Sequence, residues 1–313
     1  MQRTIRIRLH PDHQIAKILE ETISDYTWSF NNVCKYGWEN KVKSGGKLHD
    51  ATYYPHRAAT KLPSQLVCSA RVKASEALKS AFKLSKKKVK GKKTKVSCPT
   101  SKKCPIRYDS RSYTIKFNSN QLSFTTVNGR IKFNFELHEY YQQYLNWKNT
   151  SADLLKDRKG RWWFHVVMET ETPTIKASNE VVGIDLGIVN PATDNRGNFY
   201  GSKHWKNIED KIFQLRRRLQ KKGTKSAKRH LKKLSGRQRR FRKDCDHVLA
   251  KRIVESVKSG ATIVFEDITN IRGTAKVRKQ QKRRLHGWSF AQLQTFAEYK
   301  ASAKSVKIEF LDP

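Results

Sequence analysis

The sequence predicts a mixed α/β protein in two parts: a small antiparallel β structure that carries a helical insertion, followed by an α/β domain. After Pro105 the chain contains short segments in which apolar residues recur with a period of two, as expected of antiparallel strands. After Pro173, apolar strand-like segments alternate with helical segments. That alternation is typical of an α/β domain.

Positive charge dominates the composition. The chain has 66 Lys and Arg against 27 Asp and Glu, a formal net charge of +39. A compact state with this charge repels itself unless a polyanion neutralises it, and the charge far exceeds the magnitude of ~2–8 that suffices for solubility. Nucleic acid is the natural polyanion. We expect no membrane partner, because no run of ~18 apolar residues occurs, and the N-terminus lacks the apolar region of a signal peptide.

The five cysteines predict free thiols rather than a disulfide framework. Their number is odd and no pair has C-x-x-C spacing, which favours a reducing cytosol. Cys98 and Cys104 lie six positions apart in a Lys-rich segment. A zinc site there would need two further ligands, so unpaired thiols are the preferred interpretation.

The first part begins with a strand and two helices. Residues 4–9 alternate like a strand, and Asp12 can cap a helix over about residues 14–32. A Gly45-Gly46 turn follows, and a second helix begins near Pro63. Residues 83–93 then form a cationic loop that cannot bury itself. The lysines of this loop that we expect to contact nucleic acid are Lys86, Lys87, Lys88, Lys92 and Lys93.

Four strand-like segments follow this insertion. They cover residues 113–117, 121–124, 130–135 and 162–168. Asn128-Gly129, between two of them, is a strong hairpin signal. With the first strand, these segments predict a small antiparallel barrel built from about residues 1–10 and 105–170, into which residues 11–104 are inserted.

A change of composition at residues 171–174 predicts the domain boundary, which divides the chain into residues 1–172 and 173–313. In the second part, residues 181–184 form a continuous apolar run, as in a central strand covered on both faces. Further strands are expected at residues 192–194, 198–200, 261–265 and 306–311, and a helix at residues 290–304.

A basic helical segment occupies about residues 205–258. Gly223 is expected to break it into a helical hairpin. A run of cations can be a solvated helix face, but this one has almost no balancing acids, which favours contact with nucleic acid. The arginines that we expect to make this contact are Arg216, Arg217, Arg218, Arg237, Arg239, Arg240 and Arg242.

Two carboxylates stand at the ends of apolar strands. Asp185 follows the run at residues 181–184, and Glu266 closes the strand at residues 261–265. Charges at such positions are costly unless they have a partner or bind a metal. If the strands are neighbours, both acids could hold Mg²⁺, which prefers oxygen ligands and supports phosphodiester hydrolysis. From the residues alone, pairing with Lys or Arg is an equally good interpretation.

The local sequences favour the metal site through a family resemblance. Gly183-Ile184-Asp185-Leu186-Gly187 resembles the first motif of RuvC-type, RNase H-like nucleases, and Val264-Phe265-Glu266-Asp267-Ile268 resembles the second. With the arginine-rich hairpin between them and the segments 8–11, 62–65 and 105–109, nearly the whole chain resembles TnpB (OrfB-type) proteins of bacterial and archaeal insertion sequences.

The resemblance implies an RNA-guided DNA endonuclease related to type V CRISPR effectors. It implies an RNase H-like (RuvC) α/β domain after a small β-barrel with a helical insertion, and a prokaryotic, nucleoid-associated protein of the cytoplasm. A guide RNA from the transposon end and a double-stranded target DNA would be the partners, with base pairing reading the sequence. Asp185 and Glu266 would be catalytic ligands of Mg²⁺ or Mn²⁺.

The family pattern continues after an Asp-Pro like Asp312-Pro313 with a zinc ribbon and a third catalytic Asp, which this sequence does not contain. We therefore expect these 313 residues to bind nucleic acid and to cleave DNA poorly. Two alternatives remain open. One is a non-cleaving RNA-guided DNA-binding protein acting as a repressor. The other is a structural basic RNA-binding protein, which leaves the two strand-end acids unexplained.

Overall fold

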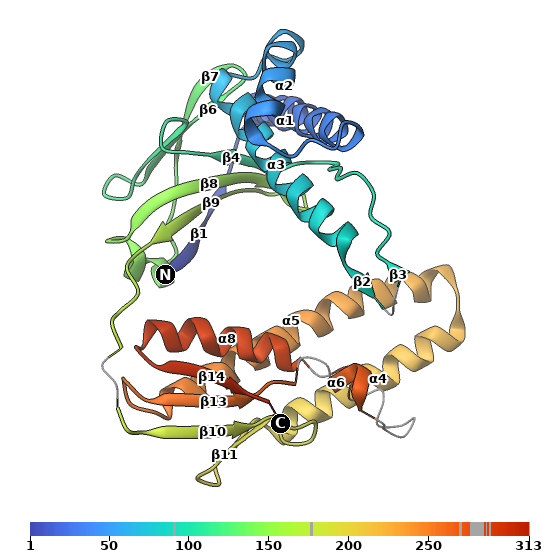
Figure 1. Cartoon of the computed structure of the whole chain (residues 1–313), viewed down its shortest axis with the longest axis vertical. Helices are drawn as coiled ribbons and strands as arrows, with labels where there is room; N and C mark the ends of the chain where they lie inside the picture. Colours follow the sequence, from blue (N-terminus) through green and yellow to red (C-terminus); the bar gives the residue numbers. More distant parts are fainter. Residues whose placement is uncertain are drawn as a thin grey trace. The chain divides into compact units, whose positions relative to one another are not determined.

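The computed structural model describes residues 1–89, 92–175, 178–268, 271–275, 285, 287 and 289–312. The chain forms two compact units: one spans Gln2–Thr170, and the other spans Glu171–Pro313 together with Met1 (Figure 1). Each unit has its own hydrophobic core. All five cysteines are free thiols, as predicted. None of the helices in the described part of the chain combines the length and apolar character needed to span a bilayer.

Three helices open the first unit: α1 (His13–Glu39), α2 (Gly45–Ala59) and α3 (Ser64–Lys86). The predicted cap of α1 is confirmed, because the Asp12 carboxylate accepts a hydrogen bond from the Ile15 amide at 2.7 Å. The predicted turn at Gly45-Gly46 is wrong, since α2 begins at Gly45. Leu48 and Thr52 of α2 are buried, so tertiary packing overrides the weak helix propensity of glycine.

Gly37 allows a close approach on α1. A Cβ atom there would lie 2.4 Å from Cδ1 of Leu78 on α3 and 2.6 Å from the carbonyl oxygen of Val42. A side chain at residue 37 would therefore force the Leu78 side chain and the backbone at Val42 to shift.

The strands of this unit form two main antiparallel sheets and a small hairpin. One sheet has the order β1-β9-β8-β4 and the other β5-β6-β7, while β2 pairs with β3. The bounds are β1 (Gln2–Leu9), β2 (Lys88–Val89), β3 (Lys92–Lys93), β4 (Ile106–Tyr108), β5 (Tyr113–Lys116), β6 (Gln121–Thr126), β7 (Gly129–Asn134), β8 (Lys148–Lys156) and β9 (Trp162–Glu169), with a 3-10 helix η1 (Glu139–Tyr144) before β8.

The five predicted strands are confirmed, but a closed barrel is not found among the described residues. The two sheets instead meet through aromatic rings: Phe124 of β6 stacks on Phe164 of β9 with centroids 5.0 Å apart, and Tyr108 of β4 packs edge-on against Phe124. The cationic loop expected at residues 83–93 is partly helical, because α3 continues to Lys86, and β2 and β3 follow. The Asn128-Gly129 hairpin joins β6 to β7, with Gly129 at φ 89°.

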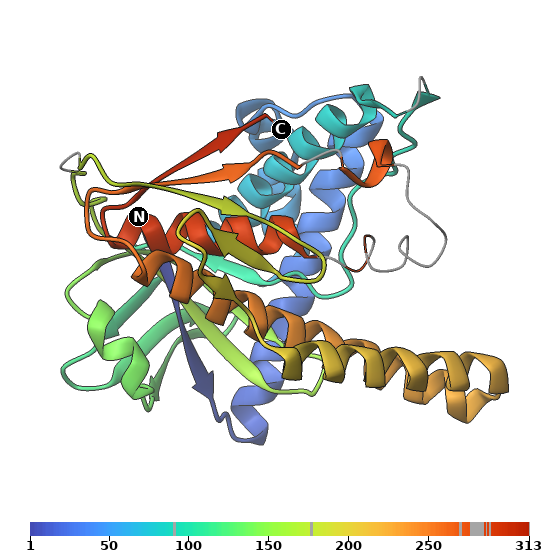
Figure 2. The same cartoon turned by 90° about the horizontal axis from the view of Figure 1, so that it is seen from below.

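The second unit is built on one five-stranded sheet of order β12-β11-β10-β13-β14 (Figure 2). The pairs β10–β11 and β11–β12 are antiparallel, whereas the pairs β10–β13 and β13–β14 are parallel. The bounds are β10 (Val181–Asp185), β11 (Ala192–Asp194), β12 (Phe199–Tyr200), α4 (Lys203–Lys222), α5 (Lys225–Glu255), β13 (Thr262–Glu266), α6 (Ile271–Thr274), α8 (Phe290–Ala303) and β14 (Lys307–Leu311).

The core of this unit lies on one face of the sheet. Ile184 of β10 and Phe265 of β13 are buried in one cluster with Leu249 of α5 and Leu293 of α8, and α8 lies along that side of the strands (Figure 1). On the other face Val181 is 56% exposed. The prediction that β10 is covered on both faces is therefore wrong for the described residues.

The ring of Phe164 joins the two sheets of the first unit, since it contacts Tyr108, Tyr113 and Phe124 and is fully buried. We expect Phe164→Ala to lower the free energy of unfolding by about 3–5 kcal/mol through lost burial and a cavity. Urea unfolding of the full chain, followed by circular dichroism, measures the change. The control Phe199→Ala removes a ring that is 71% exposed and should leave the free energy of unfolding nearly unchanged. Equal losses for both variants would contradict the role of Phe164 between the two sheets.

Candidate metal centre and nucleic-acid interface

The two predicted acids stand at the same edge of one sheet. Asp185 is the last residue of β10 and Glu266 is the last residue of β13. These strands are parallel neighbours, and Ile184 pairs with Phe265. Asp185 and Glu266 are the next residues on each strand, so they lie side by side with backbones about 5 Å apart, the ordinary spacing of neighbouring strands.

Both carboxylates are on the exposed face of the sheet. Side chains alternate between faces along a strand; because Ile184 and Phe265 are buried, Asp185 and Glu266 are directed to the opposite side. Both residues are exposed. Within the described part of the chain, neither carboxylate has a hydrogen-bond or ion-pair partner, so both remain available to a ligand.

Backbone contacts hold this edge in place. The Asp267 amide donates to the Leu311 carbonyl at 2.7 Å, and the Gln294 side chain of α8 donates to the Glu266 carbonyl at 3.0 Å. On the other side Asp185 pairs with Thr193 of β11. The two acids therefore extend from a backbone that is fixed by its neighbours.

The second glycine of the first motif has a steric role. A Cβ atom at Gly187 would lie 2.6 Å from the carbonyl oxygen of Asn190, so the tight turn after Asp185 requires glycine at this position. The first glycine, Gly183, meets nothing within 4 Å, and its carbonyl accepts from the Asn195 amide.

Asp194 of β11 is a third acid near this edge, and sequence reasoning did not single it out. Its carboxylate accepts bonds from the Asn198 side chain at 2.8 Å and the Tyr200 hydroxyl at 3.0 Å. Burial opposes ionisation of Asp194, but the bonds from Asn198, Tyr200 and the Arg196 amide together hold its pKa below the usual range. Asp194 is thus a satisfied structural acid that fixes the β11–β12 turn.

The chemistry of the pair fits a hard divalent cation. No group of three or more His, Cys, Asp or Glu side chains that could hold a metal occurs among the described residues. Mg²⁺ usually binds through one or two carboxylates and keeps several waters or substrate phosphates, so Asp185 and Glu266 would suffice as its protein ligands.

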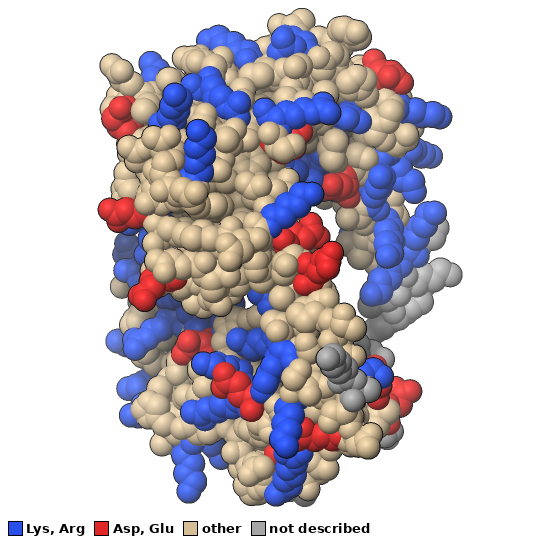
Figure 3. Space-filling view, turned by 90° about the vertical axis from the view of Figure 1, so that its left-hand side faces the viewer, with Lys and Arg blue, Asp and Glu red and all other residues tan. Residues whose placement is uncertain are grey.

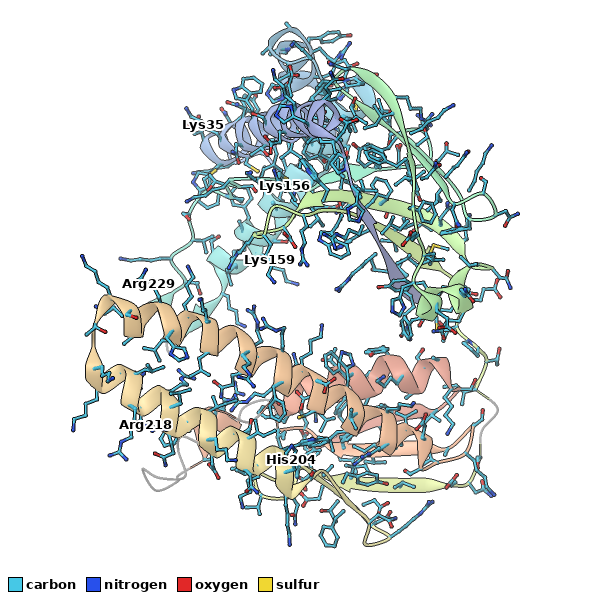
Figure 4. The ribbon with its side chains drawn as sticks, turned by 180° about the vertical axis from the view of Figure 1, so that it is seen from behind. Lys35, Lys156, Lys159, His204, Arg218 and Arg229 are labelled. Atoms are coloured by element: carbon cyan, nitrogen blue, oxygen red, sulfur yellow. The ribbon has the colours of Figure 1, made fainter. Side chains whose placement is uncertain are left out.

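The basic hairpin is confirmed as two long helices, α4 and α5. Gly223 ends α4 in the left-handed conformation at φ 65°, as predicted, and Thr224 caps α5. From Lys211 to Lys243 there are sixteen Lys and Arg and no Asp or Glu. Figure 4 shows Arg218 on α4 and Arg229 on α5, both toward the end of the hairpin away from His204.

Two of the predicted contact arginines have partners inside the hairpin. Arg216 donates to the Gln238 side chain at 3.0 Å, and Arg242 forms a salt bridge with Glu209 at 2.6 Å. These bonds join α4 to α5. The predicted arginines that are exposed are Arg217, Arg218, Arg237, Arg239 and Arg240.

The predicted lysines of the first unit are only partly described. Lys86 ends α3 and Lys87 follows it, and both are exposed. The side chains of Lys88, Lys92 and Lys93 lie outside the described residues. In Figure 3, Lys and Arg side chains are scattered over the face shown and are more widespread on it than Asp and Glu.

A cavity of about 870 Å³ lies in the second unit between α4, α5 and the turn after Asp185. Neither Asp185 nor Glu266 lines it. Asp246 does, and it is only 6% exposed. Its Oδ2 atom has no hydrogen-bond partner in the described part of the chain. Burial raises the pKa of Asp246 to about 6, against the opposing effects of Ser289 and Arg242.

Comparison with known proteins finds similarity to transposon proteins over part of the chain. The family described as "Probable transposase" (OrfB_IS605) matches residues 165–284. The TnpB-like protein MJ0751 of Methanocaldococcus jannaschii is 35% identical over 113 residues, which are 34% of this chain and 41% of that protein. A putative RNA-guided DNA endonuclease of Streptomyces pristinaespiralis is 27% identical over 159 residues, 49% of this chain and 38% of that protein.

The predicted resemblance is therefore confirmed over these stretches, in which the chain is similar to OrfB-type transposon proteins and to one named TnpB-like. The matches span about two fifths of the length of both curated relatives.

Among solved structures, a Cas12f1–sgRNA–target DNA complex is similar with a TM-score of 0.33 and 17% identity, covering 100% of this chain and 85% of that one. AacC2c1 with sgRNA and extended non-target DNA is similar with a TM-score of 0.49 and 8% identity, covering 85% and 53%.

The raised pKa of Asp246 makes stability depend on pH. In the unfolded chain an Asp has a pKa of about 3.9, so Asp246 binds its proton more tightly in the folded state than in the unfolded state. The contribution of Asp246 to the free energy of unfolding is therefore most favourable below about pH 4 and is lost as the pH rises to about 6. We expect Asp246→Asn to match the wild type near pH 4 and to be more stable by about 2–3 kcal/mol above pH 6. Denaturant unfolding across this range measures the difference, with exposed Asp244→Asn as the control. A difference that does not vary with pH would contradict the assignment.

Proposed function

We propose that the chain carries the nucleic-acid-binding and catalytic parts of a TnpB-type RNA-guided DNA endonuclease. Asp185 and Glu266 would be the catalytic carboxylates of metal-dependent phosphodiester hydrolysis. The observation that carries the proposal is the parallel pairing of β10 with β13, which brings the acids of two separate sequence motifs to one exposed sheet edge.

The order of the sheet supports an RNase H-like (RuvC) assignment of the second unit. An antiparallel series, β10 to β12, is followed by two parallel strands, β13 and β14. The two motifs that resemble RuvC lie on β10 and β13, which are neighbours even though α4 and α5 separate them in sequence. The two successive sequence motifs thus lie on two neighbouring parallel strands of the sheet.

In this mechanism the side chains of Asp185 and Glu266 would hold Mg²⁺ or Mn²⁺ at the sheet edge. A divalent ion bound there supplies charge neutralisation of the phosphodiester and activation of water. The turn held by Gly187 and the bonds from Gln294 and Asp267 keep the two carboxylates in place. A pair supplies fewer ligands than a triad, so slow cleavage by the 313-residue chain is part of the proposal.

RNA and DNA are the partners that the charge distribution favours. The acid-free stretch from Lys211 to Lys243 would bind phosphates and release counterions. Such contacts position a duplex without reading its bases. Sequence selection by a paired guide RNA, which we take to come from the transposon end, is compatible with this division of roles.

A non-cleaving RNA-guided DNA-binding protein is the second candidate. One observation favours it: the metal-ligand pair has no third His, Cys, Asp or Glu in the described part of the chain. The two candidates share the binding surfaces and differ only in hydrolysis. A cleavage assay with the matched acid variants below therefore separates them.

The catalytic assignment predicts that Asp185→Asn and Glu266→Gln each reduce Mg²⁺-dependent DNA cleavage by about 100-fold or more, while nucleic-acid binding is retained. The assay uses protein purified with the RNA of its native locus and a plasmid library as target. Both variants should also weaken Mn²⁺ binding measured by electron paramagnetic resonance. The control Glu309→Gln changes an acid on β14 that is paired with Lys307 and should leave both readouts unchanged. Cleavage that survives both site variants would exclude this centre.

The hairpin assignment predicts a change in salt dependence. Arg217→Gln with Arg218→Gln removes two exposed cations and should lower the slope of log K against log salt for duplex DNA by about 1.8, since each phosphate contact contributes about 0.9. Fluorescence anisotropy in a potassium chloride series measures the slope. Lys116→Gln with Lys132→Gln, which removes two exposed lysines of the other unit, is the matched control. An unchanged slope for the arginine variant would show that α4 does not contact the duplex.

A further inference from the structure

The outer face of the sheet β1-β9-β8-β4 carries aromatic and cationic side chains in register. On β9, Trp163 and His165 alternate with the buried Phe164 and therefore share the outer face. Arg8 of β1 lies opposite Trp163, and Arg6 lies opposite His165. Both arginines are exposed. Arg6 and Arg8 of β1 thus stand beside His165 and Trp163 of β9 on one face of the sheet.

Trp163 is held in a fixed orientation by the turn between β8 and β9. Its indole N–H donates to the Asp157 carboxylate at 3.2 Å. The guanidinium of Arg161 lies 5.4 Å from the ring centroid and forms a salt bridge with the same carboxylate at 2.7 Å. The indole ring is therefore held along its edge by Asp157 and on one side by Arg161.

Asp157 organises the whole turn. Besides Trp163 and Arg161, it accepts bonds from the Lys159 amide at 2.8 Å and the Arg161 amide at 3.0 Å. Partial burial opposes ionisation of Asp157, but these bonds hold its pKa below the usual range. Gly160 completes the turn at φ 80°. One ionised carboxylate thus fixes a short hairpin whose tip consists of basic residues.

The tip presents its cations outward. Arg158 and Lys159 are exposed, and Figure 4 shows Lys159 on the β8–β9 connection of the first unit. Unlike Arg161, neither side chain has a carboxylate partner in the described part of the chain. Arg8 on the neighbouring strand, and Arg158 and Lys159 in the turn that holds the half-buried Trp163, therefore add positive charge to this part of the unit.

We propose that this surface, formed by Arg8, Arg158, Lys159, Arg161 and Trp163, binds a single-stranded segment of nucleic acid by stacking an unpaired base on Trp163. Aromatic side chains on a basic groove are the usual means of binding single strands, because every base has a stacking face and the cations follow the phosphates. The fixed indole needs no reordering on binding, which lowers the entropic cost.

This proposal rests on the proposed function, which supplies the nucleic acid. It adds that the bound strand is unpaired, that its base stacks on Trp163, and that the cations around Trp163 bind its phosphates. The internal base pairs of a duplex cannot stack on a side chain without opening, whereas every base of a single strand can. The occupant is therefore an unpaired stretch, whether of an RNA or of a DNA strand.

Three fluorescent probes test stacking separately from charge: short oligo(rU), short oligo(dT) and an abasic oligonucleotide of the same phosphate number. With the full chain, Trp163→Ala should weaken binding of the base-bearing probes between about 5-fold and about 100-fold, the range for loss of one base–aromatic stack. Affinity for the abasic probe should stay unchanged. Trp163→Phe should retain most of the affinity, which excludes misfolding as the cause of the alanine effect.

Two controls are matched in chemistry. Trp28→Ala removes a tryptophan of α1 that is 42% exposed and should leave all three affinities unchanged. Arg158→Gln with Lys159→Gln should weaken all three probes, including the abasic one, whereas Lys116→Gln with Lys132→Gln should have a smaller effect. A preference for oligo(rU) or oligo(dT) in the wild type, lost in Trp163→Ala, identifies RNA or DNA as the strand.

The outcomes separate this surface from the proposed function. If Trp163→Ala weakens base-bearing and abasic probes equally, or weakens none, the stacking site is overturned while nucleic-acid binding stands. If the wild type binds no probe and no duplex, the proposed function fails as well. A 4-thiouridine cross-link from the probe to the peptide containing Trp163 would support the site directly, and its absence in a bound complex would count against it.

Discussion

The parallel pairing of β10 with β13 is the constraint on which the second unit depends. The same register that pairs Ile184 with Phe265 in the core sets Asp185 beside Glu266 on the opposite face. A slip of one residue would move each side chain to the other face. Core packing would then bury charged groups, so the hydrophobic effect that stabilises the sheet also enforces the arrangement of the two acids.

The connection between β12 and β13 combines a structural and an electrostatic role. Leu249 and Ile253, in the C-terminal half of α5, pack into the core, whereas the stretch that joins α4 to α5 is a nearly acid-free run of cations. Within the hairpin, Arg242–Glu209 and Arg216–Gln238 hold the helices together. The remaining positive charge destabilises the isolated arm by repulsion. A bound polyanion would relieve that repulsion, so binding and stability of the hairpin are expected to be linked.

Local signals made much of this structure predictable from the sequence. Asp12 and Gly223 act through the backbone next to them, and Asn128-Gly129 fixes its own turn. The apolar runs that became β10 and β13 were recognisable by composition, and so were the acids at their ends. Helix α2 was missed because Gly45-Gly46 resembles a turn, whereas the burial of Leu48, Thr52 and His56, at helical spacing, favours a helix there.

Long-range pairing was the harder problem. Strand β8 has a register shift between Asn149 and Ser151, which breaks the period of two on which the prediction relied. Barrel closure was predicted from the number of strands, although hydrogen bonding at the sheet edges decides it; here the two sheets join through Phe124 and Phe164 instead. The Trp163 surface is long-range only in part: Arg8 comes from β1, on the neighbouring strand, whereas Asp157 and Arg161 lie in the turn just before β9.

The acids of this chain differ in what satisfies them, and that difference separates structural from functional candidates. Asp157 and Asp194 each accept several bonds from nearby donors, and these bonds offset the cost of their partial burial. Asp246 is buried with one carboxylate oxygen lacking a hydrogen-bond donor, and this burial raises its pKa. Asp185 and Glu266 differ from both kinds of acid. Both are exposed, and they lie side by side at the ends of β10 and β13, in a chain where cations are abundant. Two neighbouring carboxylates repel each other when both are ionised. Under the proposed function, a divalent cation shared between them would remove that repulsion, so the proposal gives their juxtaposition a physical reason.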